Sequence, residues 1–366
     1  AIIGAGPAGL AACEILGAAG CKVALLDEQS GAGGQIYRGI ASANAERRRV
    51  LGDDYVAGDA LLAGLDHSSV THLAGATVWE VTRGGRISYS VRDEARSLQA
   101  GQVLVATGAT ERPMPFPGWT LPGVMTVGAG QILLKTSGLL PPSPCVLAGS
   151  GPLLFLLANQ YLAAGLEVAA LVETTPKGNV GKALPHAFGA LLGNRILRKG
   201  LKLLSGLRKA GVPHYRQATN LVDEGAEAVE ALSFTAGRRQ HRLECATVMI
   251  HSGVVPNVQI SRSLNLDHVW DELQQCWRPK VDDFGGTSLE GIRIAGDGAG
   301  IVGAEASAEA GRLAAFALLA DLGKLSTAER DRRAAKALAA YRALARARPF
   351  LDALYAVAPD FLVPSD

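Results

Sequence analysis

The chain opens with AIIGAGPAGLAACEILGAAGCKVALLDEQSGAGGQ (residues 1–35), and its architecture follows from this segment. The pattern predicts a buried strand, a G-x-G-x-x-G turn, a helix and a second strand that ends at Asp27. Gly4 allows the tight turn, Gly6 leaves room for a pyrophosphate, and Gly9 permits close packing of helix and strand. The helix N-terminus would face the phosphates, and Asp27 the ribose hydroxyls. Together these elements predict a dinucleotide-binding unit.

Length and composition indicate an α/β protein of more than one domain. A chain of 366 residues exceeds the roughly 250 to 300 residues at which single cores stop growing. Its 48% hydrophobic residues and 44 glycines fit tight turns around large cores. A net charge of +2 and 5% aromatic residues give no indication of nucleic-acid binding. Every apolar run is interrupted before the ~20 residues that a membrane-spanning helix needs.

The pattern after the opening unit predicts short elements and then a crossing between domains. We expect a helical segment at residues 59–65 and antiparallel strands at 77–82 and 87–91 around a glycine turn. A buried strand at 102–105 leads into Ala106-Thr107-Gly108-Ala109. The next segment, ERPMPFPGWTLPGVM, holds four prolines and can form neither a helix nor a central strand. It therefore predicts an extended crossing segment.

The opening pattern returns later in the chain. Residues 146–148 and 168–172 are predicted strands on either side of a helix, and Glu173 follows the second strand. Such a repeat predicts a second nucleotide-binding unit. Its turn has Gly149 and Gly151 but Leu154 in place of the third glycine, which should crowd the helix and disfavour NAD(P)H. If a nucleotide binds there, Glu173 would favour NAD over NADP.

The remaining segments complete the predicted fold. A strand at 292–295 runs into Gly296-Asp297-Gly298 and an Ala-rich helix, and residues 328–355 predict a basic amphipathic helix with a solvated arginine face. The fold class is therefore α/β, with two Rossmann-like dinucleotide-binding domains and a C-terminal helical tail. The first domain is predicted at 1–115 and 281–325, the second at 116–280, and the tail at 326–366. The chain starts on a strand without Met, so we expect a few residues before it.

Four motifs spread over the chain carry a family resemblance: GAGPAG, GGQ, VATGA and IAGDG. Together they resemble the flavoprotein superfamily with two dinucleotide-binding domains of the three-layer ββα type, which includes glutathione-reductase-like and thioredoxin-reductase-like proteins. Two longer segments, GGQIYR (Gly33–Arg38) and TGATERPMPFPGWTLPGVMTVGAGQILLK (Thr107–Lys135), give a closer match. They are similar to the α subunits of heteromeric FAD-dependent amino-acid and opine dehydrogenases, such as octopine and nopaline oxidases, D-hydroxyproline dehydrogenase and hydrogen cyanide synthase.

The resemblance implies which residues bind the cofactor. Thr107 and Gly108 would lie beside the dinucleotide, and Asp297 would accept a ribityl hydroxyl, with a plain helix N-cap as its alternative role. A second nucleotide site, if it is used, would comprise Gly149, Gly151 and Glu173. The expected cofactor-binding residues of the first site are Gly4, Gly6, Pro7, Ala8, Gly9, Asp27, Glu28, Gly34, Gln35, Arg38, Val78, Ala106, Thr107, Gly108, Gly296 and Asp297.

FAD is the cofactor that the resemblance implies. The first glycine motif recognises an ADP group, so NAD(H) or ATP in place of FAD stays open. A flavin-dependent β subunit would oxidise the substrate, a small γ subunit is present in some relatives, and FMN at a subunit interface is a further option. A cysteine-rich segment for a [2Fe–2S] cluster, present in many relatives, is not found before the closing VPSD; either the given sequence ends before it or this member lacks it. We expect a cytoplasmic protein; peripheral attachment to a membrane through the electron acceptor stays open.

Three functions are compatible with the sequence. The first is the electron-transferring α subunit of an amino-acid or opine (D-hydroxyproline-like) dehydrogenase complex. The alternatives are a stand-alone NAD(P)H-dependent flavin oxidoreductase and a nucleotide-binding scaffold without redox activity of its own. Disulfide reduction is excluded, because it needs a cysteine pair beside the flavin. No such pair exists among Cys13, Cys21, Cys145, Cys245 and Cys276, which we expect to be buried thiols.

Several side chains keep two interpretations. Arg38 either places positive charge near a flavin or phosphate or is a surface residue. The histidines show no dyad or metal-ligand spacing, so the catalytic residues stay unknown and no metal is expected. His251, next to the GVVPN turn, is the one histidine for which we weigh a site role. Two interpretations apply to the apolar residues Tyr37, Phe116, Trp119 and Met125. They either form a patch for a partner subunit or an interface flavin, or they pack between the two domains.

Overall fold

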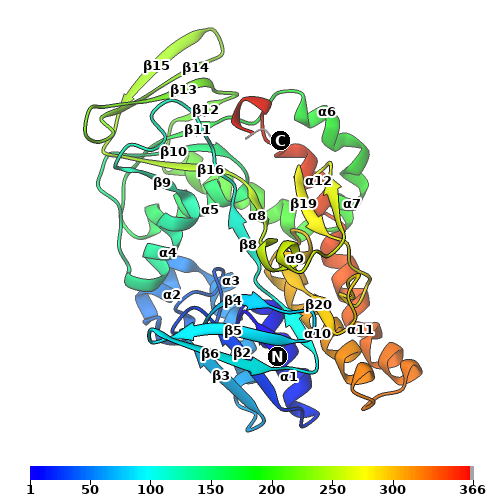
Figure 1. Ribbon diagram of the computed structural model, residues 1–366. Helices are drawn as coiled ribbons and strands as arrows, with labels where there is room; N and C mark the ends of the chain where they lie inside the picture. The colour runs from blue at the N-terminus through cyan, green and yellow to red at the C-terminus, as the bar shows by residue number, and fades with distance from the viewer. Residues whose placement is uncertain (363–366) are drawn as a thin grey trace.

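The computed structural model describes residues 1–362, except the side chains of residues 194 and 196. It contains two Rossmann-like domains, the first in the lower half of Figure 1 and the second in the upper half. Residues 363–366, the closing VPSD of the sequence, lie outside the described residues. The predicted α/β fold class with two such domains is confirmed.

The first domain is built on a parallel sheet of five strands in the order β20-β7-β1-β2-β3. Its strands are β1 (Ile2–Ile3), β2 (Val23–Asp27), β3 (Val70–Ala74), β7 (Val103–Val105) and β20 (Ile292–Ile294). Ile2 and Leu25 face a helical layer, whereas Ile3 and Leu26 face a small antiparallel sheet. Burial on both faces explains why these strands are continuous apolar runs in the sequence.

Two layers cover this sheet. On one face, α1 (Pro7–Ala18) lies against α10 (Ala304–Asp321), so closely that a Cβ added at Gly311 would lie 2.0 Å from the Ala8 carbonyl oxygen. The other face carries the antiparallel sheet, whose first two strands confirm the predicted pair and whose third strand was not predicted. Its strands are β4 (Thr77–Val81), β5 (Arg86–Val91) and β6 (Glu94–Gln99). Shorter helices follow β2: η1 (Ile40–Ser42), α2 (Ala45–Leu51), α3 (Asp53–Val56) and η2 (Ala57–Leu65).

The second domain repeats this plan. Its parallel sheet has the order β12-β11-β10-β16-β9. The strands are β9 (Val124–Thr126), β10 (Cys145–Ser150), β11 (Val168–Glu173), β12 (His214–Arg216) and β16 (Thr247–Ser252). One face packs on the helices α4 (Val127–Ser137), α5 (Pro152–Ala163) and α8 (Asn194–Lys209), and the other on an unpredicted antiparallel sheet of β13 (Thr219–Glu224), β14 (Ala231–Ala236) and β15 (Arg239–Glu244). The predicted internal repeat is therefore observed.

Two extended segments connect the domains. β8 (Ala109–Glu111) and β17 (Val254–Pro256) pair in antiparallel fashion between the two large sheets (Figure 1). The proline-rich segment begins with β8, as predicted for a crossing segment. The chain returns to the first domain through α9 (Gln259–Ser263), the hairpin of β18 (His268–Asp271) and β19 (Cys276–Pro279), β20, and the 3-10 helix η4 (Gly296–Ala299).

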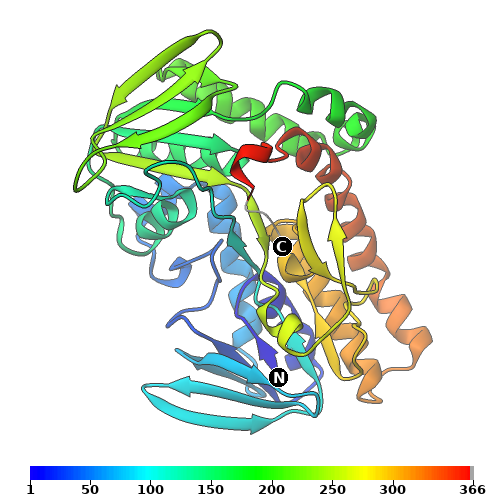
Figure 2. The same ribbon diagram turned by 45° about the horizontal axis from the view of Figure 1, so that its top comes forward.

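The C-terminal part is two helices rather than the single helix predicted at 328–355. α11 (Thr327–Ala345) ends before Arg346, and α12 (Arg348–Leu354) follows with Pro349 in its first turn, which favours a new helix start. The chain then leads through the 3-10 helix η5 (Pro359–Phe361) along the second domain, as Figure 2 shows at the red end of the ribbon. Two further helices, α6 (Asn179–Ala183) and α7 (Ala187–Leu192), and the 3-10 helix η3 (Leu184–His186) between them pack beside α12.

Candidate functional site

The glycine turn of the first domain has the geometry of a phosphate-binding loop. Gly4 has a φ of +105°, and a Cβ there would lie 2.4 Å from the Ala106 carbonyl oxygen. A Cβ at Gly9 would lie 2.0 Å from the Gly4 carbonyl oxygen, so helix and strand touch as predicted. A Cβ at Gly6, in contrast, would project into open space, with the Gly34 Cα at 3.8 Å as the nearest atom. The turn thus leaves room at the one position where a pyrophosphate must approach.

The helix that follows this turn presents free backbone donors. α1 begins at Pro7 after Gly6, and no side chain caps its first turn. Its unpaired N–H groups and the positive end of its dipole therefore point toward the space beside Gly6. Ala8 is buried in this first turn. A helix start of this kind, at the carboxyl edge of a parallel sheet, suits a bound phosphate.

Asp27 lies at the end of β2, where it was predicted, but its carboxylate is already engaged. One oxygen accepts a hydrogen bond from the Ala5 N–H at 2.5 Å, and the other accepts one from the Gln29 N–H at 2.8 Å. The side chain is buried, whereas Glu28 is exposed. Each Asp27 oxygen keeps a second lone pair that can accept from a ribose hydroxyl. Asp27 therefore also fixes the glycine turn, a role that the sequence did not reveal.

The Gly-Gly-Gln loop packs against the glycine turn. A Cβ at Gly34 would lie 2.8 Å from the Gly6 Cα, so the two backbones approach closely. Arg38 is half-buried and donates to Gln35 Oε1 at 2.9 Å, to the Gly34 carbonyl oxygen at 3.4 Å and to the Gln29 side chain. The guanidinium therefore lies at the edge of the crevice and is not a free surface group.

The end of β7 brings Ala106, Thr107 and Gly108 to the same edge of the sheet. The Thr107 hydroxyl is buried and has no hydrogen-bond partner among the described residues. A Cβ at Gly108 would meet nothing within 4 Å, and its φ of +65° suits glycine. Buried polar groups normally have partners, so this unpaired hydroxyl is a candidate for a contact with a bound ligand. These residues fit the dinucleotide that the motif predicts. Val78, also predicted, is half-buried on β4.

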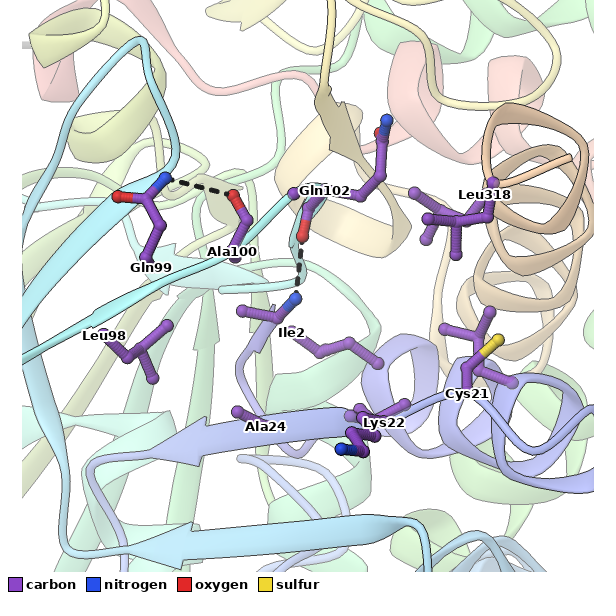
Figure 3. A pocket seen from close by; sticks show the side chains of 14 residues that line it. Ile2, Cys21, Lys22, Ala24, Leu98, Gln99, Ala100, Gln102 and Leu318 are labelled. Atoms are coloured by element: carbon purple, nitrogen blue, oxygen red, sulfur yellow. Dashed lines mark hydrogen bonds between the residues drawn. The ribbon is translucent and has the colours of Figure 1, made fainter.

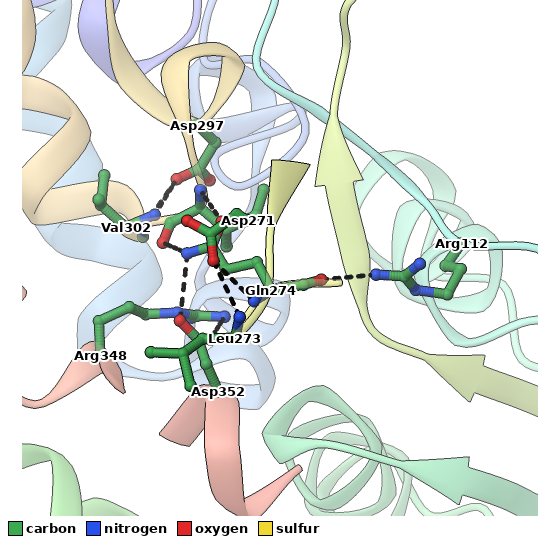
Figure 4. Close-up of polar contacts among 10 residues, drawn as sticks. Arg112, Asp271, Leu273, Gln274, Asp297, Val302, Arg348 and Asp352 are labelled. Carbon is green, nitrogen blue, oxygen red and sulfur yellow. Dashed lines mark hydrogen bonds and ion pairs between the residues drawn. The ribbon is translucent and has the colours of Figure 1, made fainter. Parts of the chain in front are cut away.

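Asp297 holds the loop that leads into α10, but it is not the N-cap of that helix, which is Gly303. Its Oδ1 accepts hydrogen bonds from the N–H groups of Val302 and Gly303, both at 2.8 Å, just before α10. Gln274 fixes the same loop by bonding both polar backbone groups of Ile301 at 2.9 Å (Figure 4). No hydrogen bond to Oδ2 exists in the described part of the chain, so a ribityl contact by Asp297 stays a prediction.

Two cavities lie away from the glycine turn. One of about 340 Å³ lies between the loop after Gly296 and α11 and α12, and it contains the ion pairs Arg278–Asp271 and Arg348–Asp352 (Figure 4). The other, of about 220 Å³, lies at the amino ends of β1 and β2 (Figure 3). The first of these cavities borders Ile294 and Gly296, at the carboxyl end of β20. The second lies at the amino ends of its strands, where dinucleotides do not bind.

The glycine turn of the second domain is filled by a histidine. His251 on β16 corresponds to Ala106, which follows β7 in the first domain. A Cβ at Gly149 would meet the His251 carbonyl oxygen, just as a Cβ at Gly4 would meet the Ala106 carbonyl oxygen. A Cβ at Gly151 would lie 3.2 Å from the His251 Cδ2. The imidazole thus lies where the first domain has open space beside Gly6. Leu154, in place of the third glycine, is fully buried in the helical core.

A carboxylate holds His251 in this place. Its Nδ1 is 2.7 Å from Glu111 Oε1, and Glu111 Oε2 accepts the N–H of Gly128 at the start of α4. Glu111 belongs to the crossing segment, 140 residues away in the sequence. The sequence shows no dyad spacing for His251, because the fold makes this histidine–carboxylate pair from residues far apart in the chain.

Glu173, the predicted ribose ligand of the second domain, is occupied by its neighbours. Its Oε2 lies 2.9 Å from His214 Nε2 on the adjacent strand, and its Oε1 accepts from the Thr175 hydroxyl at 2.9 Å. Tyr355, from the C-terminal part, lies near Glu173, and burial together with the Glu173 charge raises the pKa of Tyr355 to about 12. Glu173 thus has an internal role in the fold.

The C-terminal segment crosses the carboxyl edge of the second sheet. Asn179, which is buried, donates its Nδ2 to the carbonyl oxygens of Leu354 at 3.2 Å and Ala356 at 2.8 Å. The Tyr355 ring lies 6.3 Å from that of Phe155 in the helical layer. Val357 and Phe361 are buried in the opposite layer. This edge is where a second dinucleotide would bind, and the chain's own residues 354–361 cover it.

A buried polar chain connects the two domains near the first crevice. Lys135 on α4 donates to the Gln35 carbonyl oxygen at 3.0 Å and to Gln131 Oε1 at 2.7 Å, and Gln131 donates to Gln160 at 2.9 Å. Burial and then the nearby charge of Arg38 lower the pKa of Lys135 to about 7. No pattern in the sequence indicates this lysine beyond its place in the proline-rich motif.

The aromatic residues with two interpretations pack within the chain. Tyr37 and Phe116 are buried in different cores, Met125 packs against the first of these cores and Trp119 against the second. They are therefore not a partner surface in this structure. All five cysteines are buried free thiols, as predicted. Within residues 1–362, no cluster of metal-ligating side chains is found, and no helix is long and apolar enough to span a bilayer.

Known proteins share this sequence and fold. Residues 1–315 match the family described as pyridine nucleotide-disulphide oxidoreductase. The chain is 40% identical over 372 residues to an opine oxidase subunit from Agrobacterium tumefaciens (strain Ach5), covering all of this chain and 74% of that protein. It is 32% identical over 358 residues to hydrogen cyanide synthase subunit HcnB of Pseudomonas aeruginosa, covering 95% of this chain and 76% of that protein.

Solved structures confirm the fold. L-proline dehydrogenase from P. horikoshii superimposes with a TM-score of 0.64 at 18% identity, over 92% of this chain and 58% of that chain. Thioredoxin reductase from T. acidophilum gives a TM-score of 0.61 at 20% identity, over 88% of this chain and 97% of that chain. The predicted resemblance to opine oxidase and hydrogen cyanide synthase subunits is confirmed as well. The chain therefore belongs to the pyridine nucleotide-disulphide oxidoreductase family and is a flavin-dependent oxidoreductase.

Proposed function

We propose that this chain is the electron-transferring subunit of an amino-acid or opine dehydrogenase complex. It binds FAD in the first domain, receives electrons from a partner β subunit that oxidises the substrate, and does not take them from NAD(P)H. A γ subunit, and FMN at the contact between subunits, are compatible with this role. We place the complex in the cytoplasm.

One observation carries the proposal: the first crevice is open and the second is filled. A Cβ at Gly6 would meet only the Gly34 Cα, at 3.8 Å, and the Thr107 hydroxyl at the end of β7 lacks a partner among the described residues. The corresponding place in the second domain holds the His251 imidazole, and residues 354–361 lie over it. A flavin reductase needs both sites, one for the flavin and one for the pyridine nucleotide. With one usable site, electrons must come from elsewhere.

Each residue of the first crevice would have a definite task. The N–H groups at the start of α1 and the bare Gly6 would hold the pyrophosphate, Asp27 a ribose hydroxyl, and Thr107 a polar atom of the flavin half. Arg38 would place positive charge at the crevice edge, which favours a reduced, anionic cofactor. Bound FAD would supply the redox chemistry.

The names of the relatives support the substrate class and the need for a partner. The opine oxidase and hydrogen cyanide synthase relatives are both described as subunits, and the structural relative acts on proline. Asp27, the carboxylate that the fold holds against the first glycine turn, is hydrogen-bonded to the backbone and is not free to remove a proton from an amino acid. We therefore assign substrate oxidation to the partner.

The visible absorption spectrum of the purified chain tests this proposal. We expect a yellow protein that stays oxidised when NADH is added under nitrogen and that bleaches when the partner subunit, co-expressed with this chain, and its amino acid or opine are present. Bleaching by NADH alone would establish the flavin reductase instead. A colourless protein that releases ATP, ADP or NAD on denaturation would establish the scaffold function.

A further inference from the structure

The helices after β11 expose apolar side chains to an unusual degree. Among the described residues, eight large apolar side chains are more than half exposed, and six of them lie between residues 180 and 201. These are Val180, Leu184, Phe188, Leu191, Leu192 and Leu201. They lie on α6, η3, α7 and α8; α6 and α7 are at the upper right of Figure 1. We call this surface, together with the basic residues around it, the α6–α8 face.

The amphipathic pattern of α6 and α7 is inverted. Small or polar residues face inward: Asn179, Ala183 and Ala190 are 2%, 1% and 1% exposed. The large residues at Val180, Leu184, Phe188 and Leu191 recur every three or four positions, as one helix face does, and are 58%, 65%, 74% and 66% exposed. A helix on the surface of a globular protein normally has the opposite arrangement.

The inward face is closely packed, so the exposure is not a matter of loose docking. A Cβ at Gly189 would lie 2.5 Å from the Arg346 carbonyl oxygen, and one at Gly193 would lie 2.9 Å from the Ala347 Cβ. Asn179 is hydrogen-bonded to the chain after α12. The large side chains therefore cannot turn inward, because the small residues already fill that contact.

The charge that these helices themselves carry has one sign. Between Glu173 and Asp223 the sequence has no acidic residue and nine basic ones: Lys177, Lys182, Arg195, Arg198, Lys199, Lys202, Arg208, Lys209 and Arg216. Arg195 pairs with Glu305 at 2.9 Å, and Lys199 pairs with Asp54. Lys182, Arg198 and Lys202 are exposed, and no ion pair holds them within the described part of the chain.

We propose that the α6–α8 face docks on the surface of a bilayer that contains anionic lipids. Exposed leucine, valine and phenylalanine side chains can enter the boundary between headgroups and acyl chains, and lysine and arginine attract the anionic headgroups. A protein partner is the weaker explanation, because lysine is depleted at protein interfaces. The attachment is peripheral, since no described helix is long and apolar enough to cross a bilayer. This inference does not depend on the proposed function.

Sedimentation with lipid vesicles tests it. The full chain is mixed with phosphatidylcholine vesicles or with vesicles that also contain phosphatidylglycerol, at about 0.1 M and about 1 M salt. We expect binding to the anionic vesicles that weakens at high salt. The Phe188→Ser/Leu191→Ser variant should lose about tenfold or more of this affinity, because each side chain no longer leaves water. Lys182→Glu/Lys202→Glu should lose a similar factor.

Matched controls keep the result unambiguous. Leu139→Ser removes a leucine that is 55% exposed after α4, and Lys280→Glu reverses an exposed charge elsewhere; neither should change binding. Circular dichroism melting checks that all variants fold. Binding that is equal on neutral and anionic vesicles, or unchanged by both double substitutions, would overturn the proposal. The proposal would also fail if the full-length protein did not bind anionic vesicles. It would fail as well if no vesicles were bound and Phe188→Ser/Leu191→Ser instead released a partner subunit.

Discussion

The two Rossmann-like domains share one plan and differ in what lies over their strand ends. In the first, the Cβ position of Gly6 faces open space; in the second, that of Gly151 faces the His251 imidazole at 3.2 Å. In the first, the Thr107 hydroxyl has no partner among the described residues; in the second, Glu173 and His214 are hydrogen-bonded to each other. The comparison teaches that a repeated fold does not repeat a binding site, which depends on side chains from other parts of the chain.

The filling of the second crevice stabilises the protein. Residues 354–361 contribute Val357 and Phe361 to the core between the second sheet and β13–β15, and Phe361 contacts Phe116 edge to face at 6.5 Å between ring centres. Burial of such side chains stabilises by about 1.5 to 3 kcal/mol each. No such segment covers the first crevice, so the free energy of unfolding of the first domain should increase when a ligand binds there.

The largest expected effect comes from filling the first crevice as the second one is filled. Gly6→Val should weaken FAD binding by about a hundredfold or more, equivalent to about 2.8 kcal/mol, because the side chain enters the space for the pyrophosphate. The fold should survive, since the nearest atom to an added Cβ is 3.8 Å away and φ is −80°. Flavin retained after gel filtration measures the effect. Gly31→Val in the neighbouring loop after β2, with nothing within 4 Å, is the control; equal flavin content in both variants would contradict the comparison.

A pH dependence should belong to the second domain. Asp223 is 4% exposed, its carboxyl oxygens have no partner among the described residues, and burial raises its pKa to about 7. The folded state therefore keeps a proton that the unfolded state loses above its ordinary pKa near 4, so stability falls as pH rises from about 4 to about 7. Asp223→Asn should remove this loss and raise the free energy of unfolding by about 4 kcal/mol at pH 8, with little change at pH 4.

Denaturant unfolding at several pH values measures this effect. Asp282→Asn is a suitable control, because Asp282 is exposed and already accepts hydrogen bonds from the Phe284 and Gly286 N–H groups. A wild-type protein whose stability does not fall between pH 4 and pH 7, relative to Asp223→Asn, would show that the Asp223 carboxyl has a partner. The second domain would then contain a polar site that the comparison with the first domain misses.

Loosening the cover of the second crevice tests whether the cover alone blocks it. Asn179→Ala removes two hydrogen bonds to residues 354–356 and should destabilise the protein by about 2 kcal/mol, because two partly buried carbonyl groups lose their donor. Hydrogen exchange in residues 354–361 should accelerate. NADH should still not bleach the flavin, because His251 and Leu154 remain in place. If NADH does reduce this variant, the C-terminal segment is a removable lid and the second site is functional.

The first domain could be predicted from the sequence to a large extent, and the second only in outline. The glycine turn, Asp27 and the Thr107-Gly108 strand end are local in sequence, so their spacing carries their geometry. The crossing segment was predictable because proline excludes other structures. His251–Glu111 and Asn179–Leu354 join residues 140 and 175 positions apart, and spacing cannot reveal such pairs. Leu154 correctly indicated an altered second site, but not that the chain itself fills it.

The smallest expected effect concerns the Thr107 hydroxyl, the observation on which the open state of the first crevice depends most. Thr107→Val keeps the shape and removes the unpaired hydroxyl. If that group bonds a cofactor, FAD affinity should fall by about tenfold at most, while the flavin-free protein should melt at an equal or higher temperature, since a buried unpaired hydroxyl costs stability. Fluorescence titration of the apoprotein and melting without FAD measure both effects. Lower stability of the variant with unchanged FAD affinity would show that the Thr107 hydroxyl bonds within the protein. The unpaired hydroxyl would then no longer distinguish the first domain from the second.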